Sequence, residues 1–128
     1  MNVFISALLA PTGAPARLVV RWLAGDFEVI ASEQLLSELA RALAYPKLRG
    51  RVSREEAAAF VDLLRATATV NLDAPNPARA SRDPADNYLV SLAASSASIL
   101  VTGDRDLLEL ASELPIYSPS SFLAKLPT

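Results

Sequence analysis

The chain has 128 residues, 52% hydrophobic and 20% charged, a composition typical of one folded domain and not of a disordered segment. It contains neither cysteine nor histidine, which excludes disulfides, thiol chemistry, Ser-His-Asp catalysis and the common zinc sites. The net charge of −2 is not the basic excess that nucleic-acid-binding proteins usually have. Any chemistry must therefore use carboxylates, hydroxyls, amines or a bound hard cation such as Mg²⁺ or Mn²⁺.

The first third of the chain alternates between predicted helices and a short strand. Residues 1–9 are almost wholly apolar and fit either a short strand or a short helix. The pattern predicts a helix over 15–25, a strand over 27–31, and a helix over 32–44 that Ser32 caps. The buried stripe of this last helix is expected to be Leu35, Leu36, Leu39 and Leu43.

The alternation continues to the C-terminus. One helical turn is expected within 45–51, and Ser53 with Glu56 forms a capping-box pattern that opens the next helix. The remaining predicted elements are a strand over 69–72, a loop over 74–81, a helix over 83–95, a strand over 98–102, a helix over 104–111, a strand over 115–117 and a helix over 118–126.

Short apolar strands that alternate with helices predict an α/β fold, in which helices cover both faces of a parallel sheet. We expect one domain over residues 1–128. No apolar run approaches the about 20 residues that span a membrane, and the N-terminus lacks the basic region of a signal peptide. Together with the absence of cysteine, this favours a cytoplasmic protein with no membrane partner.

Two aspartates, Asp104 and Asp106, follow the strand predicted over 98–102. Ligands of α/β sheets bind beyond the carboxyl ends of strands, and residues 102–106 are expected at such an end. The ordinary interpretation is that both acids lie at a helix N-terminus, where they accept backbone N–H bonds and face the positive end of the dipole. They can do so and still bind a cation through their free oxygens.

Asp83 and Asp86 lie at the start of the helix predicted over 83–95. Asp83 is expected to be an N-cap. At about 100° per residue, Asp86 falls on the apolar stripe of its own helix, and a carboxylate pointed at a core must be paired, protonated or metal-bound. Arg82 is a candidate ion-pair partner, so pairing and metal binding both stay open.

Glu38 lies at the flank of the stripe of the helix over 32–44, where a glutamate is usually solvated. In an α/β fold, three segments can bring Glu38, Asp86 and Asp104 to one edge of the sheet. Such carboxylates repel each other unless a divalent cation neutralises them. The cation would activate a water for attack on a phosphodiester, with Glu38 or Asp86 as the base.

One segment of the chain is locally basic, although the whole chain has a net negative charge. Its ordinary interpretation is a solvated surface; if the chain acts on RNA, the same residues are candidate RNA contacts. The segment consists of Arg41, Lys47, Arg49, Arg51 and Arg54.

The order and spacing of five stretches resemble the PIN-domain nucleases, and most closely the bacterial VapC-like toxins of toxin–antitoxin pairs. The resemblance covers nearly the whole chain, to PIYSPSSFLAKL. The five stretches are NVFISALL, GAPARLVVRWLAGDFEVIASEQLLSELARAL, YPKL, SRDPADNYLVSLA and LVTGDRDLL.

This resemblance implies a PIN-like three-layer sandwich and an Mg²⁺- or Mn²⁺-dependent endoribonuclease that acts as the toxin of a type II toxin–antitoxin system. It also implies an RNA substrate, a homodimer and a cognate antitoxin that blocks the site. The implied acidic cluster is Glu38, Asp86 and Asp104, with support from Asn2, Asp83, Thr102 and Asp106.

The chain departs from the family at its start. The family begins with an apolar strand that ends in Asp-Thr-Asn and lies at the middle of the sheet, whereas here MNV stands where DTNV is expected. Either the start is misassigned, or the gene is shortened and its product impaired. An unpaired buried polar group costs about 1–3 kcal/mol, a large share of a total stability of about 5–15 kcal/mol. We therefore expect no open gap in the sheet: either residues 2–6 join it, or a partner chain supplies a strand.

Two alternatives remain beside the nuclease. One is a catalytically impaired PIN-like module that binds an antitoxin or a second copy of itself, which the missing first acid favours. The other is a phosphatase-like hydrolase with an aspartate of TGDRD as nucleophile. Such enzymes usually place the nucleophile after the first strand, and no acid lies near this N-terminus.

Overall fold

The computed structural model describes residues 2–72 and 87–127, and of Asn2 and Asn87 it describes the backbone only. The loop predicted over 74–81 and the first residues of the helix predicted over 83–95 lie outside this part of the chain.

The N-terminal region is a pair of packed helices, α1 (Asn2–Leu9) and α2 (Ala14–Leu23). A proline in the first turn of α2 is preorganised for a helix start, and Gly25 (φ +89°) adopts the left-handed conformation just after its end. Residues 2–9, whose sequence fits either a strand or a helix, therefore form a helix. The ring of Phe4 packs edge-on against Phe60, with 5.9 Å between ring centroids.

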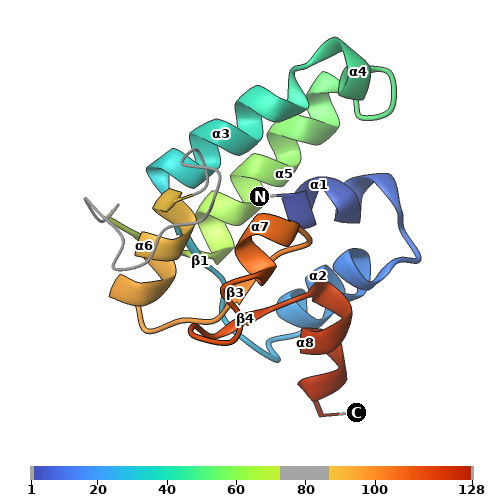
Figure 1. Cartoon of the computed structure of the whole chain (residues 1–128). Helices are drawn as coiled ribbons and strands as arrows, with labels where there is room; N and C mark the ends of the chain where they lie inside the picture. The colour runs from blue at the N-terminus through green and yellow to red at the C-terminus, as the bar shows by residue number, and fades with distance from the viewer. Residues whose placement is uncertain (1, 73–86, 128) are drawn as a thin grey trace.

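The central region is a helical hairpin of α3 (Glu33–Leu43) and α5 (Arg54–Thr67), joined by the short α4 (Pro46–Arg49) at its tip (Figure 1). The predicted caps are confirmed: Ser32 Oγ accepts the Leu35 N–H at 3.2 Å, and Ser53 and Glu56 form the reciprocal capping box. The predicted stripe is confirmed as well. Each of its leucines is buried, and so is Leu64 of α5.

The strands are short and pair in parallel. β1 (Ile30–Ser32) pairs with β2 (Thr69–Asn71), and β3 (Leu100–Val101) pairs with β4 (Ile116–Tyr117). All four overlap ranges that were predicted as strands, but each is shorter than its range, and β1 ends one residue later than predicted, at Ser32. The parallel strands among helices confirm the α/β fold class.

Three more helices complete the described chain: α6 (Asn87–Ser95), α7 (Arg105–Leu108) and α8 (Pro119–Lys125). β1 runs directly into α3, β3 is followed by α7, and β4 is followed by α8. The hydroxyl of Ser118 caps α8 by accepting the Ser121 N–H at 3.2 Å. A strand that is followed within a few residues by a helix is therefore the repeating unit of the described fold.

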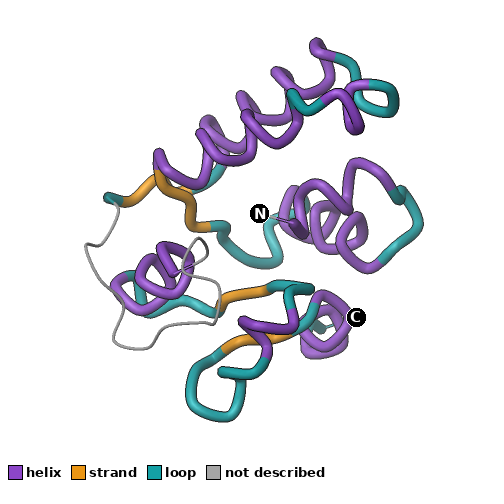
Figure 2. The backbone as a smooth tube through the Cα atoms, turned by 45° about the horizontal axis from the view of Figure 1, so that its top comes forward, coloured by secondary structure: helices purple, strands orange, loops and turns teal. Residues whose placement is uncertain are grey.

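The described strands do not form one continuous sheet. They form two separate pairs, β1–β2 and β3–β4, which lie apart from each other (Figure 2). The expectation that residues 2–6 join the sheet is therefore wrong, whereas its alternative, a strand supplied by a partner chain, stays a prediction. The physical reason is that residues 2–9 satisfy their backbone within α1 and bury side chains such as Phe4 against α5.

No single helix among the described residues is long and apolar enough to cross a membrane. The stretches Val3–Leu9 and Ala14–Leu23 reach that length and composition only as a pair, and they are bent by 101° to each other.

Candidate functional site

A hydrogen-bonded group of polar residues lies in the turn between β3 and α7. Thr102 is buried, and its backbone N–H donates to the Tyr117 carbonyl of β4 at 3.0 Å, which ties the end of β3 to its neighbour. The hydroxyl of Thr102 accepts the Asp104 N–H at 3.0 Å. The end of β3 therefore fixes the backbone of Asp104, the first of the two aspartates.

Asp104 is the N-cap of α7, as predicted. Its Oδ1 accepts the Asp106 N–H at 2.9 Å, while Asp106 lies in the first turn of the same helix. Both side chains are half-buried. A carboxylate has about four acceptor positions, so one capping bond leaves Asp104 with capacity for a further ligand. Thr102, Asp104 and Asp106 are thus brought together by one turn.

Glu38 lies midway along α3 at the flank of the leucine stripe, as predicted, with 30% of its side chain exposed. Its carboxylate forms an ion pair with Arg41, one helical turn further on. A ligand or substrate at Glu38 would have to share this carboxylate with Arg41 or displace the guanidinium.

The other predicted site residues have no described side chain. Asp83 and Asp86 lie outside the described residues, and Asn2 opens α1 with its side chain undescribed. Among residues 2–72 and 87–127, no three acidic side chains cluster closely enough to hold a metal ion. The described carboxylates are the right donors for a hard cation, but they do not by themselves make a complete metal site.

Some side chains of the predicted basic segment are exposed to solvent, and others contact the rest of the protein. Lys47 and Arg54 are exposed. Arg41 pairs with Glu38, and Arg51 donates to the Leu9 carbonyl at 3.2 Å, which connects α1 to the α3–α5 hairpin. Arg49 is half-buried, and its Nη1 has no hydrogen-bond partner within the described part of the chain.

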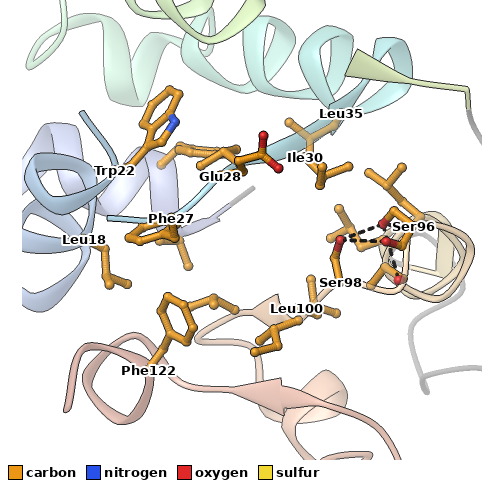
Figure 3. A pocket seen from close by; sticks show the side chains of 18 of the residues that line it. Leu18, Trp22, Phe27, Glu28, Ile30, Leu35, Ser96, Ser98, Leu100 and Phe122 are labelled. Carbon is orange, nitrogen blue, oxygen red and sulfur yellow. Dashed lines mark hydrogen bonds between the residues drawn. The ribbon is translucent and has the colours of Figure 1, made fainter. Parts of the chain in front are cut away.

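An apolar groove of about 550 Å³ lies between the two strand pairs (Figure 3). Ile30 of β1 and Leu100 of β3 lie on opposite sides of it, and Trp22 of α2 lines it as well. Figure 3 also shows the carboxylate of Glu28 directed toward the groove. Glu28 was not among the predicted site residues. The feature that could have pointed to it is its position as the one charged residue in the otherwise apolar run FEVIA.

Comparison with known proteins agrees with this architecture. The family model for the PIN domain matches residues 1–106. The chain is also 28% identical over 127 residues to the uncharacterized protein MJ1680 of Methanocaldococcus jannaschii, an alignment that covers 99% of this chain and 82% of that protein. No solved structure matches the chain. The α/β fold, the parallel strands and a family match over most of its length show that this chain belongs to the PIN domain family.

Proposed function

We propose that this chain is a metal-dependent endoribonuclease and the toxin of a type II toxin–antitoxin system. PIN domains are generally nucleases that use divalent metal ions, and this chain belongs to that family. The observation that carries the proposal is the Thr102–Asp104 turn: a carboxylate held by a buried threonine directly after a strand, with acceptor capacity left for a ligand.

The residues proposed to hold the ion are Glu38, Asp86 and Asp104, and the ion is proposed to be Mg²⁺ or Mn²⁺. When bound, such an ion would supply an activated water and charge neutralisation at the phosphodiester. Thr102 would hold the Asp104 backbone, and the Asp106 N–H would keep one Asp104 oxygen engaged, which leaves the other oxygen available as a ligand. The Arg41 guanidinium would limit how far the Glu38 carboxylate can move.

The basic segment is the proposed contact for the RNA backbone. Lys47 and Arg54 support this because their side chains are exposed and therefore accessible to phosphates. Arg51 and Arg49 also belong to the proposed surface, although the contact of Arg51 with Leu9 gives it a structural role as well. A homodimer, a cognate antitoxin and a cytoplasmic place of action are further parts of the proposal, the last because the chain has no cysteine to suit an oxidising compartment.

The test is cleavage of a long single-stranded RNA in Mn²⁺, with EDTA as the control. We expect EDTA to abolish cleavage, and Asp104→Asn to lower its rate about 100-fold or more, the usual contribution of a group that acts in the chemical step. Circular dichroism and thermal unfolding of each variant would show that the fold is intact.

Two acids on one helix give a matched control. Glu33 and Glu38 both belong to α3 and both pair with an arginine, Glu33 with Arg65 and Glu38 with Arg41. We expect Glu38→Gln to lose activity and Glu33→Gln to keep it. Equal activity in both variants would remove Glu38 from the site.

The toxin role needs its own experiment. Expression of the active chain should arrest growth, and co-expression of the antitoxin should relieve the arrest and yield a purified complex. A folded chain that binds such a partner but never cleaves RNA under any metal condition would contradict the nuclease proposal and point to a binding module.

A further inference from the structure

An exposed tyrosine lies inside the basic segment at the tip of the α3–α5 hairpin. Tyr45 is 56% exposed and precedes α4, which lies at the end of the hairpin opposite β1 (Figure 1). The other aromatic side chains of the described chain are buried or half-buried, and the Tyr45 ring has no aromatic or cation–π contact with any of the described residues. Single exposed apolar side chains are common on protein surfaces, so the surroundings of Tyr45 must decide what its exposure means.

The backbone around Tyr45 is fixed by hydrogen bonds and by the proline that follows it. The Tyr45 N–H donates to the Ala42 carbonyl at 3.2 Å, and the Tyr45 carbonyl accepts the N–H groups of Leu48 and Arg49, both at 3.0 Å. Pro46 holds Tyr45 in an extended conformation (φ −62°, ψ 140°). A ring with two side-chain torsions on a fixed backbone loses little conformational entropy when it binds a partner.

The surroundings of Tyr45 are positively charged. Residues 41–54 contain all five side chains of the basic segment and no acidic one, although the whole chain has a net charge of −2. Of these cations, Lys47, Arg51 and Arg54 are exposed. Cations without interspersed acids suit a polyanion, and an exposed ring among them suits a flat base that stacks while the neighbouring phosphates are held. The combination therefore favours a single-stranded nucleic acid over a protein segment as the partner.

Helix α3 connects Tyr45 with the candidate carboxylate of Glu38. Glu38, Arg41 and Tyr45 follow one another at spacings of three and four residues, which places them on one face of a helix. Tyr45 continues this row beyond Leu43, the last residue of α3, because Ala44 still has helical backbone angles. At about 1.5 Å per residue, Tyr45 lies about 10 Å along the helix axis from Glu38. A base on Tyr45 would thus belong to a nucleotide close to, but not at, a phosphate held at Glu38.

We propose that Tyr45 is a stacking platform for one unpaired base of an RNA strand that runs along α3, with Lys47 and Arg54 on the flanking phosphates. The inference rests on the proposed function, from which it takes RNA as the polyanion. It adds a requirement on the substrate: the base that stacks on Tyr45 must be free of a duplex. Its identity matters little, because every base has a π-face.

The test measures RNA binding without cleavage, by fluorescence anisotropy in EDTA, with a single-stranded RNA of about 12 uridines. Tyr45→Ala should weaken binding at least about 5-fold, whereas Tyr45→Phe and Tyr45→Trp should preserve it because they keep a ring. Leu23→Ala is the matched control, since Leu23 is 49% exposed but belongs to α2 and not to the basic segment. It should bind as the unchanged chain does.

The salt dependence of binding separates stacking from charge. Tyr45→Ala should leave the slope of affinity against salt unchanged, because no phosphate contact is lost, whereas Lys47→Gln should reduce it. Arg17→Gln replaces an exposed cation of α2 and should change neither affinity nor slope. With a 2-aminopurine in the RNA, the unchanged chain should quench the fluorescence of this base, and Tyr45→Ala should abolish the quenching.

Three results would overturn the proposal. One is equal affinity of Tyr45→Ala and the unchanged chain for the single strand, and another is an equal loss of affinity for a blunt RNA duplex, in which no base is free. The third is a Tyr45→Ala chain that binds RNA normally but no longer retains a co-expressed antitoxin, because the surface would then be a protein contact.

The proposed nuclease function is tested by a separate readout. If Tyr45→Ala binds RNA normally while the unchanged chain still cleaves RNA in Mn²⁺, the stacking site is wrong and the nuclease stands. If stacking is observed in EDTA but no metal condition gives cleavage, the nuclease is wrong and the stacking site stands.

Discussion

The α3–α5 hairpin and the two strand pairs differ sharply in how well they are packed. In the hairpin, Leu36, Leu39, Leu43 and Leu64 are at most 1% exposed, and both helices have complete N-caps. The strand pairs face a groove of about 550 Å³, and the strand residues Ile30, Leu100 and Val101 that line it are only half-buried. The physical reason is that a helix forms its backbone hydrogen bonds within itself, whereas a strand needs a neighbouring strand to form them.

The largest expected effect comes from truncating one leucine in each region. Leu39→Ala should lower the free energy of unfolding by about 2–5 kcal/mol, because Leu39 is fully buried among packed side chains. Leu100→Ala should cost less than about 2 kcal/mol, because Leu100 borders the groove and already lacks contacts on one side. Urea unfolding followed by circular dichroism measures both values.

Equal costs for the two variants would mean that the groove is filled in solution.

The second comparison enlarges one buried or groove-lining side chain in each region. Ala57→Leu on α5 should destabilise the chain by about 1–3 kcal/mol, because Ala57 is buried in the packed hairpin. Ala93→Leu on α6 should be neutral or stabilise by up to about 1 kcal/mol, because the added methylene groups enter the groove. Thermal unfolding at one protein concentration would rank the two variants, and a larger loss for Ala93→Leu would contradict this account of the groove.

The smallest expected effect concerns the cap of the hairpin. Ser53→Ala removes the hydroxyl that accepts the Glu56 N–H at 3.0 Å and should cost about 1 kcal/mol of the free energy of unfolding. Ser37→Ala is a suitable control, because Ser37 is an exposed serine inside α3 of the same hairpin and does not cap the helix. Urea unfolding of both variants checks the difference.

The same cap predicts a pH dependence. The Ser53 backbone N–H donates to Glu56 at 3.0 Å, and this bond, with a smaller contribution from the Ser53 side chain, lowers the pKa of Glu56 below its usual 4.5. Because the pKa is lower in the folded state, the stabilisation is present above pH 4.5 and is lost as the pH falls through the folded value. Glu56→Gln should therefore flatten the decline of unfolding free energy in that acidic window, and an unchanged decline would contradict this assignment.

Much of the helical half was predictable from residues alone. Ser32, the leucine stripe and the Ser53–Glu56 pair act within a few residues of each other, so the sequence contains both partners of each interaction. The N-cap role of Asp104 was predictable for the same reason. The helical state of residues 2–9 was not, because a short apolar run fits a strand equally well and its contact with Phe60 decides between them.

Local spacing in the amino-acid sequence was enough to predict the helices after residue 9, their caps, the order of the α and β elements that follow, and the candidate acids at their turns. Two features depended on tertiary contacts: the strands form two separate pairs, and Ile30 and Leu100 face one groove. These features depend on which distant segments meet, and the pairing of a strand is not contained in the strand's own residues.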